Sequence, residues 1–245
     1  MGHRSQARAA CPRGTGLSAI DWARVGAELD AEGAAILPAL LTPAECASLQ
    51  ASYGEERLLR SRVHMARHGF GQGEYQYFDY PLPDRVGALR ATLYPALAPI
   101  ANRWHASLRL DSRFPDRIED FLARCHAAGQ RRPTPLLLRY VAGDYNCLHQ
   151  DLYGEHVFPL QVAVLLSAPA RDFTGGEFVL TEQRPRRQSR PLVVPLGLGD
   201  AVVFAVHHRP VQGVRGIHRA TLRHGVSRIR SGRRFTLGVI FHDAA

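Results

Sequence analysis

Two stretches of the sequence decide the fold: LLLRYVAGDYNCLHQD at residues 136–151 and HGVSRIRSGRRFTLGVIF at residues 224–241. In the first stretch, His149 and Asp151 are two positions apart. On an extended segment this spacing places both side chains on the same face, with their Cα atoms about 6.5 Å apart. Two imidazoles and one carboxylate on one triangular face suit iron(II) and leave the opposite face open for a co-substrate and oxygen. His149 and Asp151 therefore predict two of three ligands of such a site.

The third ligand must come from another strand of the same region, and the candidates are His207, His208, His218, His224 and His242. His224 is favoured because Arg234 follows it by ten residues and opens a strongly β-patterned strand, with Thr236 on the same face. A buried arginine can bind the distal carboxylate of 2-oxoglutarate through two charge-assisted hydrogen bonds. The alternatives are that Arg234 only caps a strand end, that Thr236 is an ordinary β-former, and that His218 is the third ligand.

Two other features near these motifs have two interpretations each. Tyr140 lies just before the chelating pair, and it could reach the co-substrate from the adjoining strand or pack as a half-buried side chain. His207 and His208 are adjacent, so only one of them can face a given site from a strand. We favour a position at a strand exit for this pair over contact with metal or substrate.

The second half of the chain is built of short apolar runs separated by glycine and proline. From residue 135 onward these runs are LLLRYV, FPLQVAVLLS, GEFVLTE, PLVVPL, GDAVVFAV and RRFTLGVIF. Regularly spaced short strands in a continuous block predict a sandwich or barrel-like β core. No internal repeat of fixed period occurs, which argues against propellers and solenoids. We therefore expect an α+β protein whose β domain occupies residues 132–245.

These motifs, together with GGEF at 175–178 and GDAVVF at 199–204, resemble the iron(II)/2-oxoglutarate dioxygenase superfamily. The part around LHQD is similar to the AlkB-like nucleic-acid demethylases, and the part from His224 is similar to the prolyl hydroxylases. The resemblance implies a double-stranded β-helix (jelly-roll, cupin-like) core. It also implies Fe(II), 2-oxoglutarate and O2 as cofactor and co-substrates, with ascorbate as a stimulant. The residues it assigns are the metal ligands His149, Asp151 and His224 and the co-substrate contacts Arg234, Thr236 and Tyr140.

The resemblance leaves the substrate open between several classes. Oxidative demethylation or hydroxylation of nucleic acid, as in DNA repair, is slightly favoured. AlkB-like enzymes usually have an asparagine where this chain has Leu138, and a second arginine where it has Ile240. The alternatives are therefore a hydroxylase of a protein side chain or small metabolite, and a nucleic-acid-binding member of the fold without catalysis.

Residues 17–131 predict a helical or mixed extension packed on the β domain, after a disordered tail at residues 1–16. Ser18 to Asp21 has the form of a capping box before a helix that ends at Gly33. Thr42 to Glu45 is a second helix start, with proline at the first helical position.

The rest of the extension predicts one short strand and two helical regions. The apolar run from Ala34 to Leu41 predicts a strand. Helices are expected between residues 84 and 129, interrupted at Pro95 and Pro99 because proline removes a helical hydrogen bond.

Residues 57–80 are the best candidate for a substrate lid, as a loop that leads into an aromatic strand. Arginines suit phosphates and aromatic rings suit stacked bases, so Arg60, Arg67, Tyr75 and Tyr77 are the predicted substrate contacts. The alternative is that the tyrosines belong to an ordinary extra strand that packs on the core.

The composition predicts an ordinary globular protein of 245 residues with 45% hydrophobic residues. The chain contains no lysine, so its 31 basic residues are all arginine, and the net charge is +9. This charge suits a polyanion such as single-stranded or damaged nucleic acid, although a generally basic surface is the alternative. The four cysteines lack paired spacing, and no apolar stretch reaches the roughly 18 residues that a membrane span needs. We expect a cytoplasmic protein with no membrane association and no obligate protein partner.

Overall fold

The computed structural model describes residues 20–214 and 216–245. The tail predicted at residues 1–16 and the proposed cap residue Ser18 lie outside the described residues. No described helix is both long and apolar enough to cross a membrane.

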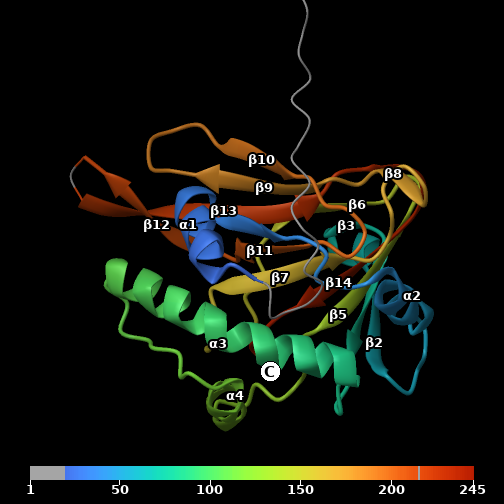
Figure 1. Ribbon diagram of the computed structural model, residues 1–245, viewed down its shortest axis with the longest axis horizontal. Helices are drawn as coiled ribbons and strands as arrows, with labels where there is room; N and C mark the ends of the chain where they lie inside the picture. The colour runs from blue at the N-terminus through green and yellow to red at the C-terminus, as the bar shows by residue number, and fades with distance from the viewer. Residues whose placement is uncertain (1–19, 215) are drawn as a thin grey trace, which may run out of the picture.

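Two antiparallel sheets form the centre of the molecule (Figure 1). The larger sheet has the strand order β1-β11-β7-β14-β5-β4-β2, with β8 paired to β14, and the smaller has the order β10-β9-β13-β6-β3, with β12 paired to β13. The strands of the larger sheet are β1 (Ala34–Leu37), β2 (Leu59–His64), β4 (Glu74–Phe78), β5 (Leu136–Val141), β7 (Leu160–Leu165), β8 (Phe173–Gly175), β11 (Ala201–Ala205) and β14 (Ile229–Val239). Those of the smaller sheet are β3 (Gly71–Gln72), β6 (Tyr145–His149), β9 (Phe178–Gln183), β10 (Arg190–Val194), β12 (His208–Gly213) and β13 (Gly216–Val226).

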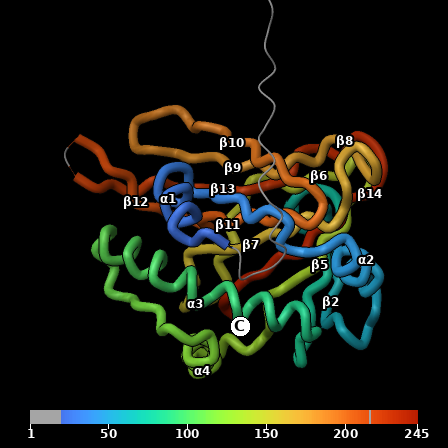
Figure 2. The backbone as a smooth tube through the Cα atoms, viewed as in Figure 1, coloured from blue at the N-terminus to red at the C-terminus, as the bar shows by residue number. Residues whose placement is uncertain are grey.

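Helices cover the outer face of the larger sheet. They are α1 (Trp22–Glu32), α2 (Pro43–Ala51), α3 (Asp84–Ser107) and α4 (Ile118–Ala127), with a short 3-10 helix η2 (Met65–His68) in the β2–β3 connection. The long helix α3 runs along this face with α4 beside it, as the backbone trace in Figure 2 shows. Leu93, Leu97 and Trp104 of α3 join Val162 and Leu237 of the sheet in the main hydrophobic core. This packing leaves the inner face of the sheet to the smaller sheet and to the cavity between them.

The predicted α+β fold with a double-stranded β-helix core and packed N-terminal helices is confirmed. The N-terminal residues also supply strands, because β1 pairs with β11, β4 pairs with β5 and β3 pairs with β6. Residues 57–80 accordingly form a hairpin of β2 and β4 and the short strand β3, where a loop was expected before Tyr75. Tyr75 and Tyr77 lie on β4, so the alternative that they belong to an extra strand is right. Strands from before and after residue 131 occur in both sheets.

Helix starts were predicted with mixed success. The Thr42 capping box is present, and Gly33 ends α1 in the left-handed conformation with φ 75°. The cap of α1 is Asp21, whose carboxylate accepts from the backbone N–H of Arg24 at 3.0 Å. The N-cap of α1 is thus the last residue of the predicted Ser18–Asp21 capping box, and Ser18 itself lies outside the described residues.

The strand predicted at Ala34–Leu41 ends at Leu37, since the chain then turns. The predicted break at Pro95 and Pro99 is also wrong, because α3 is continuous from Asp84 to Ser107. Both prolines lie on the exposed side of the helix, so the carbonyls that lose their donors can be hydrated. The apolar side stays packed on the sheet and holds the helix together.

A buried ion pair joins α3 to the C-terminal residues. Arg90 Nη2 lies 2.7 Å from Asp243 Oδ1, and both side chains are almost fully buried. Tyr80 donates its hydroxyl hydrogen to the other carboxylate oxygen at 2.9 Å, and His126 Nε2 lies 2.8 Å from it. The carboxylate thus has partners on both oxygens.

Replacement of Arg90 by methionine should destabilise the protein strongly, because it leaves Asp243 charged, buried and without its cation. We expect the free energy of unfolding, measured by urea denaturation, to fall by about 3–5 kcal/mol. The exposed pair of Arg117 with Glu119 provides the control, and Arg117→Met should leave the urea midpoint unchanged. Equal midpoints for Arg90→Met and wild type would contradict this assignment.

Candidate active site

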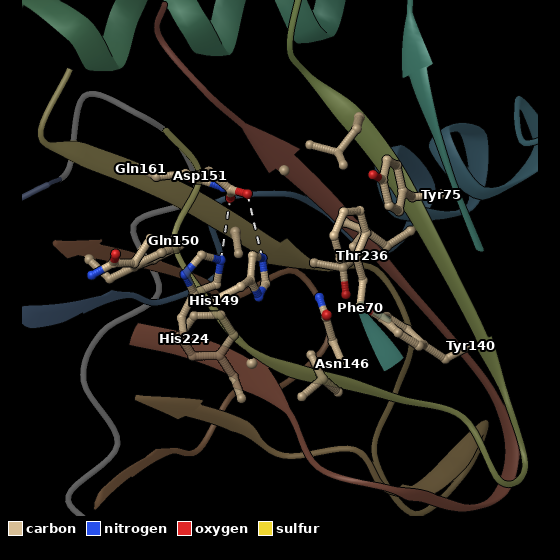
Figure 3. Close-up of a pocket in the computed structure, with 18 of the residues that line it drawn as sticks. Phe70, Tyr75, Tyr140, Asn146, His149, Gln150, Asp151, Gln161, His224 and Thr236 are labelled. Atoms are coloured by element: carbon tan, nitrogen blue, oxygen red, sulfur yellow. Dashed lines mark ion pairs between the residues drawn. The ribbon is translucent and has the colours of Figure 1, made fainter. Parts of the chain in front are cut away.

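Three predicted ligands meet at the junction of two strands in the smaller sheet (Figure 3). His149 ends β6, Asp151 follows it by two residues, and His224 on β13 lies directly opposite His149 in the strand register. His149 Nε2 lies 3.5 Å from Asp151 Oδ1, and His224 Nε2 lies 3.4 Å from Asp151 Oδ2. The candidate ligand atoms all lie within 4.8 Å of one another, so one metal ion can bind all three.

The hydrogen bonds of the site prepare it for a metal. His149 Nδ1 lies 2.8 Å from the carbonyl oxygen of Cys147, which can only accept. Nδ1 therefore carries the hydrogen, and the lone pair of Nε2 points toward Asp151 and His224. Two neutral imidazoles and one carboxylate are the donor set that non-haem iron(II) oxygenases use. These residues fit an iron(II) ion.

The charges of the triad follow from burial and mutual contact. Burial alone would raise the pKa of Asp151, but hydrogen bonds and charge interactions with His149 and His224 hold it well below its usual range. Burial lowers the pKa of His224. Hydrogen bonds and charge interaction with Asp151 outweigh burial and raise the pKa of His149. Asp151 is therefore an anion at neutral pH, which is the form in which a carboxylate binds a metal.

A buried cation lies on the facing sheet. Arg234 on β14 is 1% exposed, and its Nη1 donates to Thr236 Oγ1 at 2.5 Å, while its Nε has no hydrogen-bond partner among the described residues. Tyr140 is paired with Arg234 in the β14–β5 register, its hydroxyl is buried, and the guanidinium Cζ of Arg234 lies 5.7 Å from the centroid of its ring. Burial lowers the pKa of Arg234 to about 10, so the guanidinium remains charged at neutral pH. A buried cation with unused donors fits a carboxylate ligand.

One cavity of about 190 Å³ connects the triad with this cation. Gln161 and Ala163 of β7, Phe178 of β9 and Phe204 of β11 form part of its wall, which is mostly apolar. The cavity therefore offers a metal site, an anion site and an apolar surface within one enclosed space.

Glycine permits the arginine to lie where it does. Gly176 of the GGEF motif has φ +65°, and a Cβ atom there would lie 2.3 Å from Ile229 Cδ1 and 2.9 Å from Arg234 Cδ. Both distances are shorter than a van der Waals contact. The motif at 175–178 thus makes room for the stem of Arg234.

The predicted substrate residues have different positions. Tyr75 lines the cavity, and Tyr77 contacts it indirectly through Tyr153. Arg60 donates from Nε and Nη2 to the carbonyl of Pro133 at 3.2 and 3.0 Å and stacks over Tyr77, so its guanidinium has partners within the protein. Arg67 is exposed on η2 and does not line the cavity.

Several lining residues were not predicted. They are Phe70, Asn146, Gln150, Tyr153 and Gln161. Tyr153 continues the two-residue alternation of His149 and Asp151, and that alternation was the one sequence signal that could have identified it. Phe70, Asn146 and Gln161 reach the cavity through pairings between distant strands, which no local pattern encodes.

The alternative histidines lie elsewhere. The rings of His207 and His208 stack at 3.4 Å where β11 ends and β12 begins, as the strand-exit interpretation predicted. His218 is paired with Val211 in the β12–β13 hairpin. Within residues 20–214 and 216–245, the triad is the one group of three or more His, Cys, Asp or Glu side chains arranged to hold a metal.

Solved structures with this fold include iron-dependent oxygenases. A 2OG-Fe(II) oxygenase family oxidoreductase from Burkholderia pseudomallei matches with a TM-score of 0.54 and 18% identity, over 93% of this chain and 94% of that one. A Pseudomonas putida prolyl-4-hydroxylase matches with a TM-score of 0.51 and 16% identity, over 89% of this chain and 96% of that one. At these identities the likeness establishes the fold.

Sequence relatives are closer. A family model described as "Oxygenase, catalysing oxidative methylation of damaged DNA" matches residues 73–244. An uncharacterized protein of Mycobacterium tuberculosis is 48% identical over 198 residues, which cover 81% of this chain and 80% of the relative. Together with the His-Asp-His group in a β-helix core, these matches define the class: an iron(II)- and 2-oxoglutarate-dependent oxygenase, an oxidoreductase that uses O2. More narrowly, the chain belongs to the Oxygenase-NA family.

Loss of a triad residue should abolish metal binding. We expect His224→Ala and Asp151→Asn to reduce Co(II) affinity by more than 100-fold in a titration followed by visible absorption, because each removes one of three ligands. His218→Ala should bind Co(II) as wild type does. Retained affinity in His224→Ala combined with loss in His218→Ala would move the third ligand to His218.

A side chain at residue 176 should displace Arg234, and if Arg234 binds 2-oxoglutarate, only that binding should weaken. Gly176→Ala should raise the KM for 2-oxoglutarate about 10-fold, since displacement of a binding group by a fraction of an ångström weakens its contacts. Co(II) affinity should stay unchanged. Gly129 has φ +85° and open space around its Cβ position, so Gly129→Ala is a control for backbone strain without a clash. Equal KM values for the two variants would contradict this role for Gly176.

Proposed function

We propose that this oxygenase removes methyl groups from alkylated bases in nucleic acid. One observation carries the proposal: the cavity places the rings of Phe70 and Tyr75, from the 57–80 segment, in the same enclosed space as His149 and Asp151. Aromatic rings beside a reactive centre suit a planar base. The description of the family and the net charge of +9 support a nucleic-acid substrate.

In this proposal His149, Asp151 and His224 bind Fe(II), and Arg234 binds the distal carboxylate of 2-oxoglutarate with help from Thr236. Tyr140 adds its buried hydroxyl beside Arg234. Bound iron supplies oxygen activation, coupled to conversion of 2-oxoglutarate and O2 to succinate and CO2. Ascorbate would stimulate turnover by keeping the iron reduced.

The protein contributes orientation and exclusion of water. The apolar wall from Ala163, Phe178 and Phe204 keeps solvent away from the reacting groups. Gln161 is 4% exposed and lines the cavity, and its Oε1 has no partner among the described residues. This oxygen is available to accept a hydrogen bond from a base amino group.

The products of demethylation follow from the bonds that change. One oxygen atom of O2 enters the N-methyl C–H bond and gives an N-hydroxymethyl group, while the other enters succinate. The N–CH2OH group then breaks at its C–N bond, the nitrogen regains a hydrogen, and formaldehyde is released. Formaldehyde therefore reports demethylation, whereas a hydroxylation at carbon leaves a stable alcohol.

The catalytic test measures succinate formed from 2-oxoglutarate with Fe(II), ascorbate and O2. Arg234→Ala should raise the KM for 2-oxoglutarate on the order of 100-fold, because it removes the cation from a buried charge pair. His224→Ala should abolish turnover. Arg117→Ala, at an exposed arginine that precedes α4 and does not line the cavity, is the matched control and should retain wild-type KM. Wild-type kinetics in Arg234→Ala would reject the co-substrate role.

The substrate test adds methylated single-stranded DNA to this assay. Stimulated succinate formation with release of formaldehyde would support the proposal. Arg67→Ala should then weaken DNA binding while 2-oxoglutarate turnover without DNA is unchanged, since Arg67 is exposed outside the cavity. Turnover that DNA leaves unaltered would reject nucleic acid in favour of a protein side chain or small metabolite.

A further inference from the structure

A row of tyrosine hydroxyls leads away from the metal-binding carboxylate. Tyr153 donates its hydroxyl hydrogen to Asp151 Oδ1 at 2.8 Å, and Tyr77 donates to the hydroxyl oxygen of Tyr153 at 3.2 Å. The rings of Tyr77 and Tyr153 meet edge to face at 6.4 Å. Neither tyrosine was assigned a role in metal binding by the sequence motifs.

The direction of these hydrogen bonds is fixed by the carboxylate. Asp151 is charged and can only accept, so the single hydroxyl hydrogen of Tyr153 points to it. The oxygen of Tyr153 is then free to accept the hydrogen from Tyr77.

The outer end of the row is held by the hairpin of β2 and β4. The guanidinium of Arg60 on β2 lies over the ring of Tyr77 on β4, with 4.5 Å from Cζ to the ring centroid. Arg60 Nε and Nη2 both donate to the carbonyl of Pro133, which fixes the guanidinium plane. The residue that the sequence suggested as a phosphate contact therefore supports Tyr77.

We propose that Tyr153 is a positioning residue for the metal-binding carboxylate, and that Tyr77 and Arg60 hold Tyr153 in place. A carboxylate ligand can turn about its Cβ–Cγ bond, and a hydrogen bond to one oxygen fixes which lone pair faces the metal. Loss of such outer partners typically costs 10- to 100-fold in metal affinity or activity. The inference rests on the proposed metal site. It makes metal affinity depend on the N-terminal hairpin, which contributes no ligand.

A purely structural role for Tyr153 makes a different prediction. Its ring also lies 6.1 Å from the ring of His242, so it could act as a packing side chain alone. In that case phenylalanine would fill the same space and leave metal affinity unchanged. The two roles are therefore separated by removal of the hydroxyl oxygen alone.

The test is a Co(II) titration of the full chain without 2-oxoglutarate, followed by visible absorption. Tyr153→Phe should weaken Co(II) binding about 10-fold or more and shift the ligand-field bands, because the carboxylate loses its fixed orientation. Tyr77→Phe should weaken binding about threefold. Tyr94 has a buried hydroxyl without a partner among the described residues and lies among the phenylalanines of the main core. Tyr94→Phe is thus the matched control and should bind as wild type.

A double variant tests the order of the row. If Tyr77 acts through Tyr153, adding Tyr77→Phe to the Tyr153→Phe variant should cause no further loss of Co(II) affinity. Additive losses would overturn the placement of Tyr77 behind Tyr153. Circular dichroism checks that each variant is folded, and the single Tyr77→Phe variant decides the question if Tyr153→Phe does not fold.

The failure of this inference and that of the proposed function give different results. Wild-type protein that binds no Co(II) would overturn the metal site and the tyrosine row together. Tight binding by wild type and by Tyr153→Phe alike, with unchanged absorption bands, would overturn the row and leave the metal site intact. For a Tyr153→Phe variant that does not fold, wild-type affinity in Tyr77→Phe would overturn the row.

Discussion

The pairing of β13 with β6 is the constraint on which the site depends. It places His224 opposite His149, although the two residues are far apart in the chain, and their rings come within 4.1 Å. A shift of one residue would turn His224 to the other face of the sheet, because side chains alternate along a strand. The register shifts immediately afterwards, between His224 and Val226. The pairing is therefore direct at the two histidine ligands, and the irregularity lies beyond them. One strand register thus makes a chelating group out of separate motifs.

The negative and positive charges of the site lie on opposite sides of the cavity. Asp151 is an anion on one side of the cavity, Arg234 is a cation on the other, and no ion pair joins them among the described residues. Each would be costly to bury without a partner. A divalent metal at the triad leaves one positive charge there, and Arg234 adds another. The two negative charges of 2-oxoglutarate balance this sum, so the filled cavity is electrically neutral in an apolar wall.

The features of the site that could be predicted from the sequence are those set by residue spacing along a single strand. The spacing of two residues in His149–Asp151 and Arg234–Thr236 predicts a shared face from strand geometry alone, and the strand runs predict the β core. Tyr153 was missed because its role depends on a hydrogen bond at the end of that alternation, and Gln161 was missed because only the packing of the two sheets brings β7 to the cavity. Proline was misjudged in α3 because propensity does not show which side of a helix is exposed.

Arg60 shows why arginine content alone is a weak guide to the substrate. As a sequence feature it is one of several arginines ahead of an aromatic strand, and a phosphate contact is a reasonable prediction. In the fold its guanidinium already has a carbonyl acceptor and an aromatic ring as partners, so a phosphate would have to displace both. The groups that can touch a substrate at the reactive centre are those that reach the cavity itself. From the 57–80 segment these are Phe70 and Tyr75, which offer a substrate ring faces and edges rather than charge.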